Sequence, residues 1–168
     1  MVTETSPEVL FDVPFRSPST GLIRRIALVL TTVVVAMAAV LVDTSPADAT
    51  TAENELFTRI NRARIVHGRH VLARKYDLTL VARAQAQRMA NSGTLYHNPN
   101  LTTAVRNWRW VGENVGYGPT VLAVHRAFMA SPPHRANVLD RDYTQVGVGV
   151  VRRGSRVWVV EVFRRPLR

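Results

Sequence analysis

Cysteine is absent from the 168-residue chain, which excludes a disulfide scaffold, a zinc ribbon, an iron–sulfur site and a thiol nucleophile. Lysine is nearly absent, because Lys75 is the only one and every other basic side chain is arginine. Acidic residues are also few, 12 against 22 basic ones, so the formal net charge is +10. This excess favours anionic partners such as lipid headgroups and acidic cell-envelope polymers. No groove-reading motif accompanies it, so we expect no nucleic-acid partner.

Residues 1–49 have the features of an export leader in the required order. Arg24 and Arg25 precede an uncharged apolar run at 26–42, and Ala47-Asp48-Ala49 follows as a small-x-small cleavage site. We therefore expect cleavage after Ala49 and secretion, with the Arg pair leaving the general and the twin-arginine routes both open. The alternative is a protein anchored in the membrane through residues 26–42, because this run just reaches the length that spans a bilayer.

The chain after the predicted cleavage site, residues 50–168, is expected to form one domain. It carries 19 basic and 7 acidic residues, so the basic excess belongs to the exported part. An exported domain without cysteine is typical of a bacterial envelope or culture medium rather than of a eukaryotic secretory pathway. We expect this domain to be a monomer.

Helices are predicted in the first part of the domain. Thr50 and Glu53 have the spacing of a capping box, and the apolar periodicity that follows ends at Gly68. Asp77 is predicted to cap a second helix that ends at Gly93. A third helix is expected after Pro119-Thr120 and a short fourth one after Ser131-Pro132.

The C-terminal part changes to the period of β-strands. Valines alternate with other residues at 146–150 and again, with Trp158, at 158–162, and Gly154 lies in the turn between the two runs. Helices followed by strands predict an α+β fold, with the helices packed on a small antiparallel sheet.

Three local clusters contain side chains suited to chemistry: residues 93–97, the glycine-rich segment 112–118, and residues 131–139. Glycines in the second cluster predict tight turns and close backbone approach. If Ser131 caps the fourth helix, His134 lies in its first turn, where the positive end of the helix dipole disfavours the imidazolium form. A neutral imidazole suits a metal ligand or a general base.

Together these clusters resemble the CAP superfamily of cysteine-rich secretory, antigen five and pathogenesis-related proteins, in its short bacterial SCP-like extracellular form. The matching residues are Asn61-x-x-Arg64, Ala86-x-x-Met89-Ala90, Gly93-x-x-x-His97, Gly112-Glu113-Asn114, Ser131-Pro132-x-His134-Arg135-x-Asn137-x-Leu139 and Tyr143-Thr144-x-Val146-Gly147-Val148-Gly149. The resemblance implies a three-layer α-β-α sandwich. It also implies a central cavity lined by two histidines and two acids.

Carried onto this chain, the resemblance places His97, Glu113 and His134 in the cavity. The second acid has no counterpart, because Ser131 stands where it is expected. Asn114, Ser131 and Asn137 are expected to be structural loop and cap residues. The remaining histidines match nothing in the family pattern and are assigned to the surface or to helix faces: His67, His70 and His125.

The sequence therefore predicts a pocket that binds a divalent metal or a small apolar or lipid ligand, at the cell surface or outside the cell. His97 and His134 are the candidate ligands for zinc or another divalent cation. The first alternative is a metal-dependent protease or esterase in which Glu113 is the general base, although catalytic zinc normally has three protein ligands. The second is a basic module that adheres to anionic envelope polymers. A Ser131–His134–Glu113 triad is disfavoured because no nucleophile elbow surrounds Ser131.

Overall fold

Residues 46–167 are the part of the chain that the computed structural model describes. The predicted apolar run at 26–42 lies outside these residues. The elements, in chain order, are α1 (Pro46–Val66), β1 (Ala73–Arg74), α2 (Tyr76–Ser92), α3 (Leu101–Ala104), β2 (Trp108–Gly118), α4 (Val121–Ala130), α5 (Pro132–Leu139), β3 (Gln145–Arg153) and β4 (Arg156–Pro166). Over this described range, no helix has the length and apolar character needed to cross a membrane.

The four strands form one sheet in the order β1-β3-β4-β2, which leaves β2 at one edge. The predicted hairpin of β3 and β4 is present, and β2 pairs antiparallel with the other side of β4. The prediction of a purely antiparallel sheet is wrong, because β1 pairs parallel with β3. β1 has only two residues, so no alternating pattern could have predicted it.

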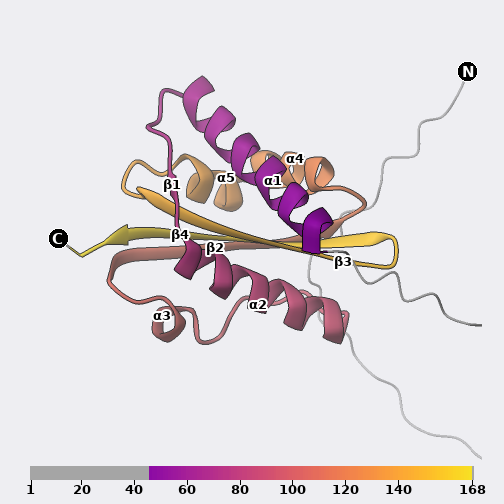
Figure 1. The fold of residues 1–168 in the computed structure, drawn as a ribbon. Coiled ribbons are helices and arrows are strands. Elements are labelled where there is room, and N and C mark those ends of the chain that lie inside the picture. The colour runs from indigo at the N-terminus through magenta and orange to yellow at the C-terminus, as the bar shows by residue number, and fades with distance from the viewer. Residues whose placement is uncertain (1–45, 168) are drawn as a thin grey trace, which may run out of the picture. The chain divides into compact units, whose positions relative to one another are not determined.

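Helices cover both faces of the sheet, which confirms the predicted α+β fold with three layers (Figure 1). α1, α4 and α5 lie on one face, where Leu56, Ile60 and Phe128 pack against buried valines of β3 and β4. α2 and α3 lie on the other face, and Ala82 and Met89 of α2 belong to the core on that side. Each face therefore has its own apolar core.

α2 lies with its backbone directly on β3. A Cβ added at Gly147 would stand 2.2 Å from the backbone nitrogen of Thr79, and one at Gly149 would stand 2.4 Å from that of Arg83. The glycines of the predicted alternation thus face α2, while the valines between them face the opposite core. The sequence pattern in β3 consequently fixes how closely helix and sheet approach.

Two predicted helix starts are wrong, because the carboxylates concerned form ion pairs with other elements. α1 begins at Pro46, so Thr50 and Glu53 lie inside the helix and form no capping box. Glu53 is buried and accepts hydrogen bonds from Arg74 and Arg83. α2 has Lys75 at its N-cap position, and Asp77, in the first turn, pairs with Arg164.

The glycine-rich segment is strand β2 rather than the predicted turn. Its glycines allow close packing, since a Cβ at Gly112 would stand 2.3 Å from the hydroxyl of Tyr143 and one at Gly116 would stand 2.8 Å from the ring of Phe128.

The predicted start of the third helix agrees with the structure, because the hydroxyl of Thr120 accepts a hydrogen bond from the backbone N–H of Ala123 at the start of α4.

Replacing Gly149 with alanine is expected to lower the free energy of unfolding by about 1–3 kcal/mol, because the backbone of α2 cannot yield to the added methyl group. Urea denaturation measures the change. Gly154→Ala is the control for the steric effect: that glycine has a left-handed φ of +59° but open space around its Cβ position, so its cost is backbone strain of about 1–2 kcal/mol. A Gly149→Ala protein as stable as the parent would contradict the close packing.

Candidate functional site

The three predicted cavity residues come from three elements that meet at the free edge of β2. His97 lies in the loop after α2, Glu113 lies in β2, and His134 lies in the first turn of α5. The loop is set by Gly93, which ends α2 in a left-handed conformation with its N–H bonded to Met89. Glu113 and Asn114 are successive residues of an extended strand, so their side chains point to opposite faces of the sheet.

Glu113 and His97 form a close pair on the α2 side of this edge. Oε1 of Glu113 lies 2.9 Å from Nδ1 of His97 and accepts a hydrogen bond of 2.8 Å from the backbone N–H of Asn98. The Glu113 side chain is only 2% exposed, whereas the His97 ring is 63% exposed. The hydrogen bond to Glu113 raises the pKa of His97, against the opposing effect of partial burial. Oε2 of Glu113 is buried and has no hydrogen-bond partner.

His134 is held from the α5 side. Its Nδ1 lies 2.8 Å from the hydroxyl of Ser131, and its ring stacks on Phe128 with 5.0 Å between the ring centroids. Burial lowers the pKa of His134, and the charge of His97 acts in the same direction. Ser131 occupies the N-cap position of α5, but its side chain makes no cap hydrogen bond to the helix backbone; it contacts His134 instead.

Two asparagines tie α5 to the edge strand. Nδ2 of Asn114 donates to the backbone carbonyl of His134 at 3.1 Å. Nδ2 of Asn137 donates to Oδ1 of Asn114 at 2.9 Å and to the backbone carbonyl of Glu113 at 3.3 Å. These bonds fix the backbone at His134 relative to the backbone at Glu113.

Sequence reasoning missed a buried carboxyl beneath this network. Glu161 is fully buried in the central strand β4 and accepts a hydrogen bond of 2.9 Å from Nδ2 of Asn114. Burial raises the pKa of Glu161 to about 8, against the opposing effect of that hydrogen bond. The alternation of the strand could have revealed this carboxyl. Glu161 lies between Val159 and Phe163 on the face that points into the core, where an acidic residue is unusual.

His125 is a second residue that the sequence placed wrongly. It was assigned to a surface or helix face, but it is 8% exposed, and its Nδ1 is buried without a hydrogen-bond partner. Burial lowers the pKa of His125 to about 4, and Arg59 adds to the effect. His125 is therefore neutral at physiological pH.

A metal at the edge site would have few protein ligands. Within residues 46–167, no group of three or more His, Asp or Glu side chains is arranged to hold a metal ion. The available donors are the imidazoles of His97 and His134, with Glu113 behind the ring of His97. Imidazole is a ligand type that suits zinc. The residues present fit a weakly held divalent cation whose remaining ligands are water.

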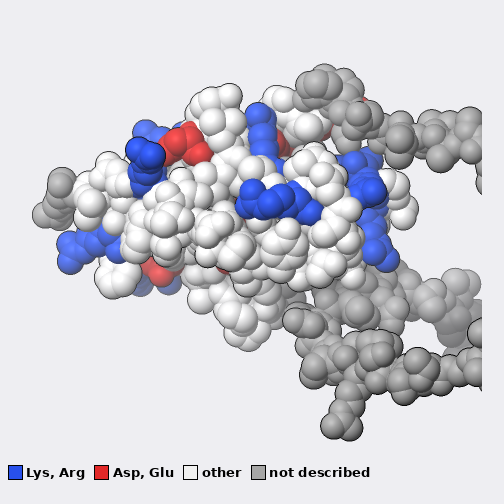
Figure 2. Space-filling view, turned by 90° about the horizontal axis from the view of Figure 1, so that it is seen from below, with Lys and Arg blue, Asp and Glu red and all other residues white. Residues whose placement is uncertain are grey.

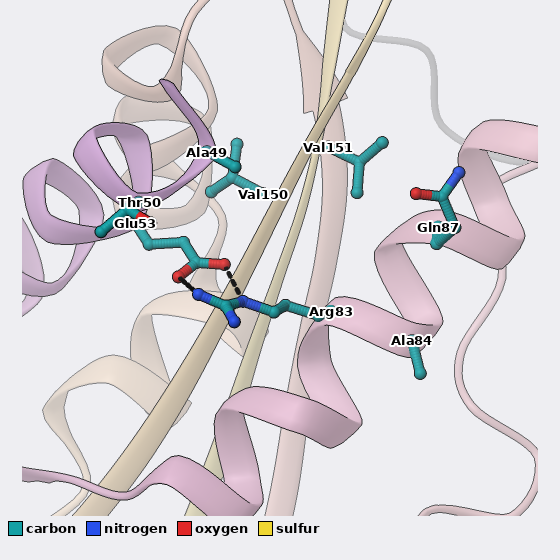
Figure 3. Close-up of a pocket in the computed structure, with 8 residues that line it drawn as sticks. All are labelled: Ala49, Thr50, Glu53, Arg83, Ala84, Gln87, Val150 and Val151. Atoms are coloured by element: carbon teal, nitrogen blue, oxygen red, sulfur yellow. Dashed lines mark hydrogen bonds and ion pairs between the residues drawn. The ribbon is translucent and has the colours of Figure 1, made fainter. Parts of the chain in front are cut away.

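A pocket of about 440 Å³ lies elsewhere, between the start of α1, the middle of α2 and β3 (Figure 3). Glu53 and Arg83 form a two-fold hydrogen-bonded pair in its wall, with both distances 2.6 Å. The residues that line it are Ala49, Thr50, Glu53, Arg83, Ala84, Gln87, Val150 and Val151. None of the three edge-site residues belongs to this pocket.

The basic side chains do not gather in one place on the α2 face. Figure 2 shows them in separate groups at both ends and across the middle of that view, with white surface between them. Several of the arginines are occupied within the domain: Arg64 is buried, for example, and donates to the backbone carbonyls of Val138 and Asp140. On this face, no continuous basic surface identifies a polyanion-binding site.

Comparison with known proteins places the chain in a family. The model of the CAP, or cysteine-rich secretory protein, family matches residues 57–163, so the chain belongs to that family. Among curated proteins, it is similar to YkwD of Bacillus subtilis, with 28% identity over an alignment of 123 residues; the match covers 68% of this chain and 48% of YkwD. The chain thus spans about half the length of that relative.

Solved structures show the same fold. An extracellular SCP-domain protein from Bacillus anthracis has a TM-score of 0.64 at 22% identity, over 72% of this chain and 44% of that one. An outer surface protein from Borrelia burgdorferi has a TM-score of 0.64 at 17% identity, over 69% of this chain and 93% of that one. These structural neighbours are extracellular or surface proteins by their descriptions, and the predicted family is confirmed.

Replacing Glu161 with glutamine is expected to stabilise the protein at neutral pH and to change its pH profile. The raised pKa of Glu161 means that its stability contribution is complete below the unfolded value of 4.5 and is lost as the pH rises toward about 8. The free energy of unfolding of the parent should fall over this window, relative to the variant, by about 1 kcal/mol per pH unit. Urea denaturation at pH 5, 6, 7 and 8 measures the difference. Parallel profiles would contradict burial of a neutral carboxyl.

Proposed function

We propose that this CAP-domain protein is exported and acts outside the cytoplasm as a binding module, with a divalent cation such as zinc held at the edge of β2. The observation that supports this proposal is the pairing of a buried carboxylate with one imidazole beside a second, neutral imidazole. Glu113 engages Nδ1 of His97, which leaves Nε2 of that ring for a ligand. A carboxylate behind a metal-binding histidine is a common arrangement, because it fixes the ring and increases its basicity.

His134 completes the proposed site from the opposite side. Its Nδ1 is engaged by Ser131, so Nε2 is again the nitrogen available to a ligand. Burial keeps this ring neutral, which is the form that binds a metal. The two oriented rings would hold the cation, which would supply a positive charge and bound waters.

The second ligand class that we propose is a small apolar or lipid molecule. On the α2 face, apolar side chains near His97 and Glu113 could contact it. Leu95 and Val111 are only partly buried and pack against the core on that side. Such a ligand would place its polar end at His97 and Glu113. The polar contacts favour a cation, because each of the two rings has Nδ1 engaged by the protein and Nε2 left for a ligand.

A metal-dependent hydrolase with Glu113 as general base is the less favoured function. Catalytic zinc normally has three protein ligands, and in the described residues no group of three His, Asp or Glu is arranged to hold a metal. Adhesion to anionic envelope polymers through the basic surface is a further proposal, and it is supported by the net charge of the chain.

Zinc is expected to raise the melting temperature through His97 and His134. At a zinc concentration tenfold above the Kd, the expected stabilisation is about 1.4 kcal/mol, or a rise of about 4 °C. The effect should be larger at pH 8 than at pH 6, because the raised pKa of His97 lets protons compete with the metal. Thermal unfolding with and without zinc measures it.

His134→Ala should abolish the zinc-induced rise, and His70→Ala, at an exposed histidine elsewhere, should leave it unchanged. Equal shifts in the parent and the His134→Ala protein would contradict the proposed site.

Zinc-dependent ester or peptide cleavage that is lost at least about 100-fold in Glu113→Gln would establish the hydrolase instead.

Export is tested through the N-terminus of the mature protein. We propose cleavage after Ala49, so that protein recovered from the culture medium begins at Thr50 and has lost about 5 kDa. α1 begins at Pro46, so cleavage would remove its first four residues and leave the rest of the helix in place. N-terminal sequencing and intact mass decide between the two proposals: a protein that retains residues 26–42 would be membrane-anchored.

A further inference from the structure

Asn114 occupies a central position between the sheet and α5. Its Nδ2 donates to two acceptors, the backbone carbonyl of His134 and Oε2 of Glu161, while its Oδ1 accepts from Asn137. Both hydrogens of the amide are therefore used, and the side chain is fully buried. An amide in this position has two orientations related by a flip, and only one of them makes all three bonds.

Glu161 is one of three partners that favour this orientation, together with the carbonyl of His134 and Nδ2 of Asn137. It stands directly opposite Asn114 in the register of β2 and β4, so the two side chains share the face of the sheet that α4 and α5 cover. Oε2 of Glu161 accepts from Nδ2, and no donor other than Asn114 is bonded to this carboxyl in the described residues. An acceptor at this point holds Nδ2 toward Glu161 and His134, and leaves Oδ1 for Asn137.

We propose that Glu161 is a positioning residue: by fixing the amide of Asn114, it sets the place of His134 relative to the His97–Glu113 pair. Glu161 touches none of these three side chains, and it acts through one hydrogen-bonded neighbour. The proposal rests on the proposed function, because its functional consequence is the affinity of the edge site for a cation.

The chain from Glu161 to the site is short. When this acceptor is removed, Nδ2 of Asn114 loses one of its two acceptors, and only the carbonyl of His134 and Nδ2 of Asn137 hold the amide in its orientation. With fewer partners the amide can flip. A flipped amide would turn its oxygen toward the carbonyl oxygen of His134 and its nitrogen toward Nδ2 of Asn137, which breaks two of the three bonds that tie α5 to β2. The ring of His134 would then be held by Ser131 and Phe128, both on its own side of the site, and α5 would keep only the bond from Asn137 to the carbonyl of Glu113. Loss of such outer partners typically weakens metal binding about 10- to 100-fold.

Three variants of the full domain test this role by zinc titration in a calorimeter. Glu161→Gln retains an acceptor oxygen and should bind zinc within about twofold of the parent. Glu161→Met has a side chain of similar length without a strong acceptor and should bind at least about tenfold more weakly. Val159→Ala is the matched control: it lies on the same strand and the same face, is fully buried and makes no polar contact in the network. It should lose stability but bind zinc as the parent does.

Zinc affinity of Glu161→Met within twofold of the parent would overturn the proposal, as would an equal loss in Val159→Ala. If Glu161→Met does not fold, Glu161→Val takes its place, because valine is the residue type of its neighbours in β4. A tenfold loss is expected there too, and an unchanged affinity would again overturn the proposal.

A metal-free readout separates this proposal from the proposed function. The side-chain amide protons of Asn114 should exchange slowly with solvent in the parent and in Glu161→Gln, and at least about tenfold faster in Glu161→Met, as followed by NMR. If the parent binds no zinc, the proposed function fails while this comparison still tests the role of Glu161. Equal exchange in all three proteins would contradict that role.

Discussion

The site depends on a buried carboxylate at the edge of a sheet. Glu113 is almost completely removed from solvent, and an isolated carboxylate in that position would be costly. The backbone N–H of Asn98 and the ring of His97 compensate for the lost hydration of one of its oxygens. Because both partners come from the loop after α2, the carboxylate determines where this loop meets β2. The position of His97 therefore follows from the burial of Glu113.

The opposite face of the same two strands carries the second half of the arrangement. Asn114 follows Glu113 in the strand, so it points toward α5, where it contacts His134 and Glu161. Glu161 is buried, its partner is the amide of Asn114, and its raised pKa favours the neutral acid. Glu113, by contrast, has the imidazole of His97 beside it. Two carboxyls on neighbouring strands thus have different partners: Glu113 faces the imidazole of His97, and Glu161 faces the amide of Asn114.

Periodicity was sufficient to predict an α+β fold, because it reports which face of an element is apolar, and the family resemblance implied the three layers. The sequence predicted α4 from Thr120 and the hairpin of β3 and β4, and the resemblance pointed to His97, Glu113 and His134. It failed where a tertiary contact overrides a local pattern: Glu53 looked like a capping residue but is bonded to Arg74 and Arg83, and glycines that suggested a turn lie in β2 against Tyr143 and Phe128. Glu161 was visible as an acid on a core face, but its partner Asn114 depends on the register of the strands.

The proposed site requires that two imidazoles from opposite faces of the sheet share one cation at the edge of β2. A crystal structure of the exported domain soaked with zinc, measured at the zinc absorption edge, tests this requirement. We expect one anomalous peak about 2.0–2.1 Å from Nε2 of both His97 and His134. A peak at neither ring, or zinc bound only to the exposed histidines His67 and His70, would contradict it.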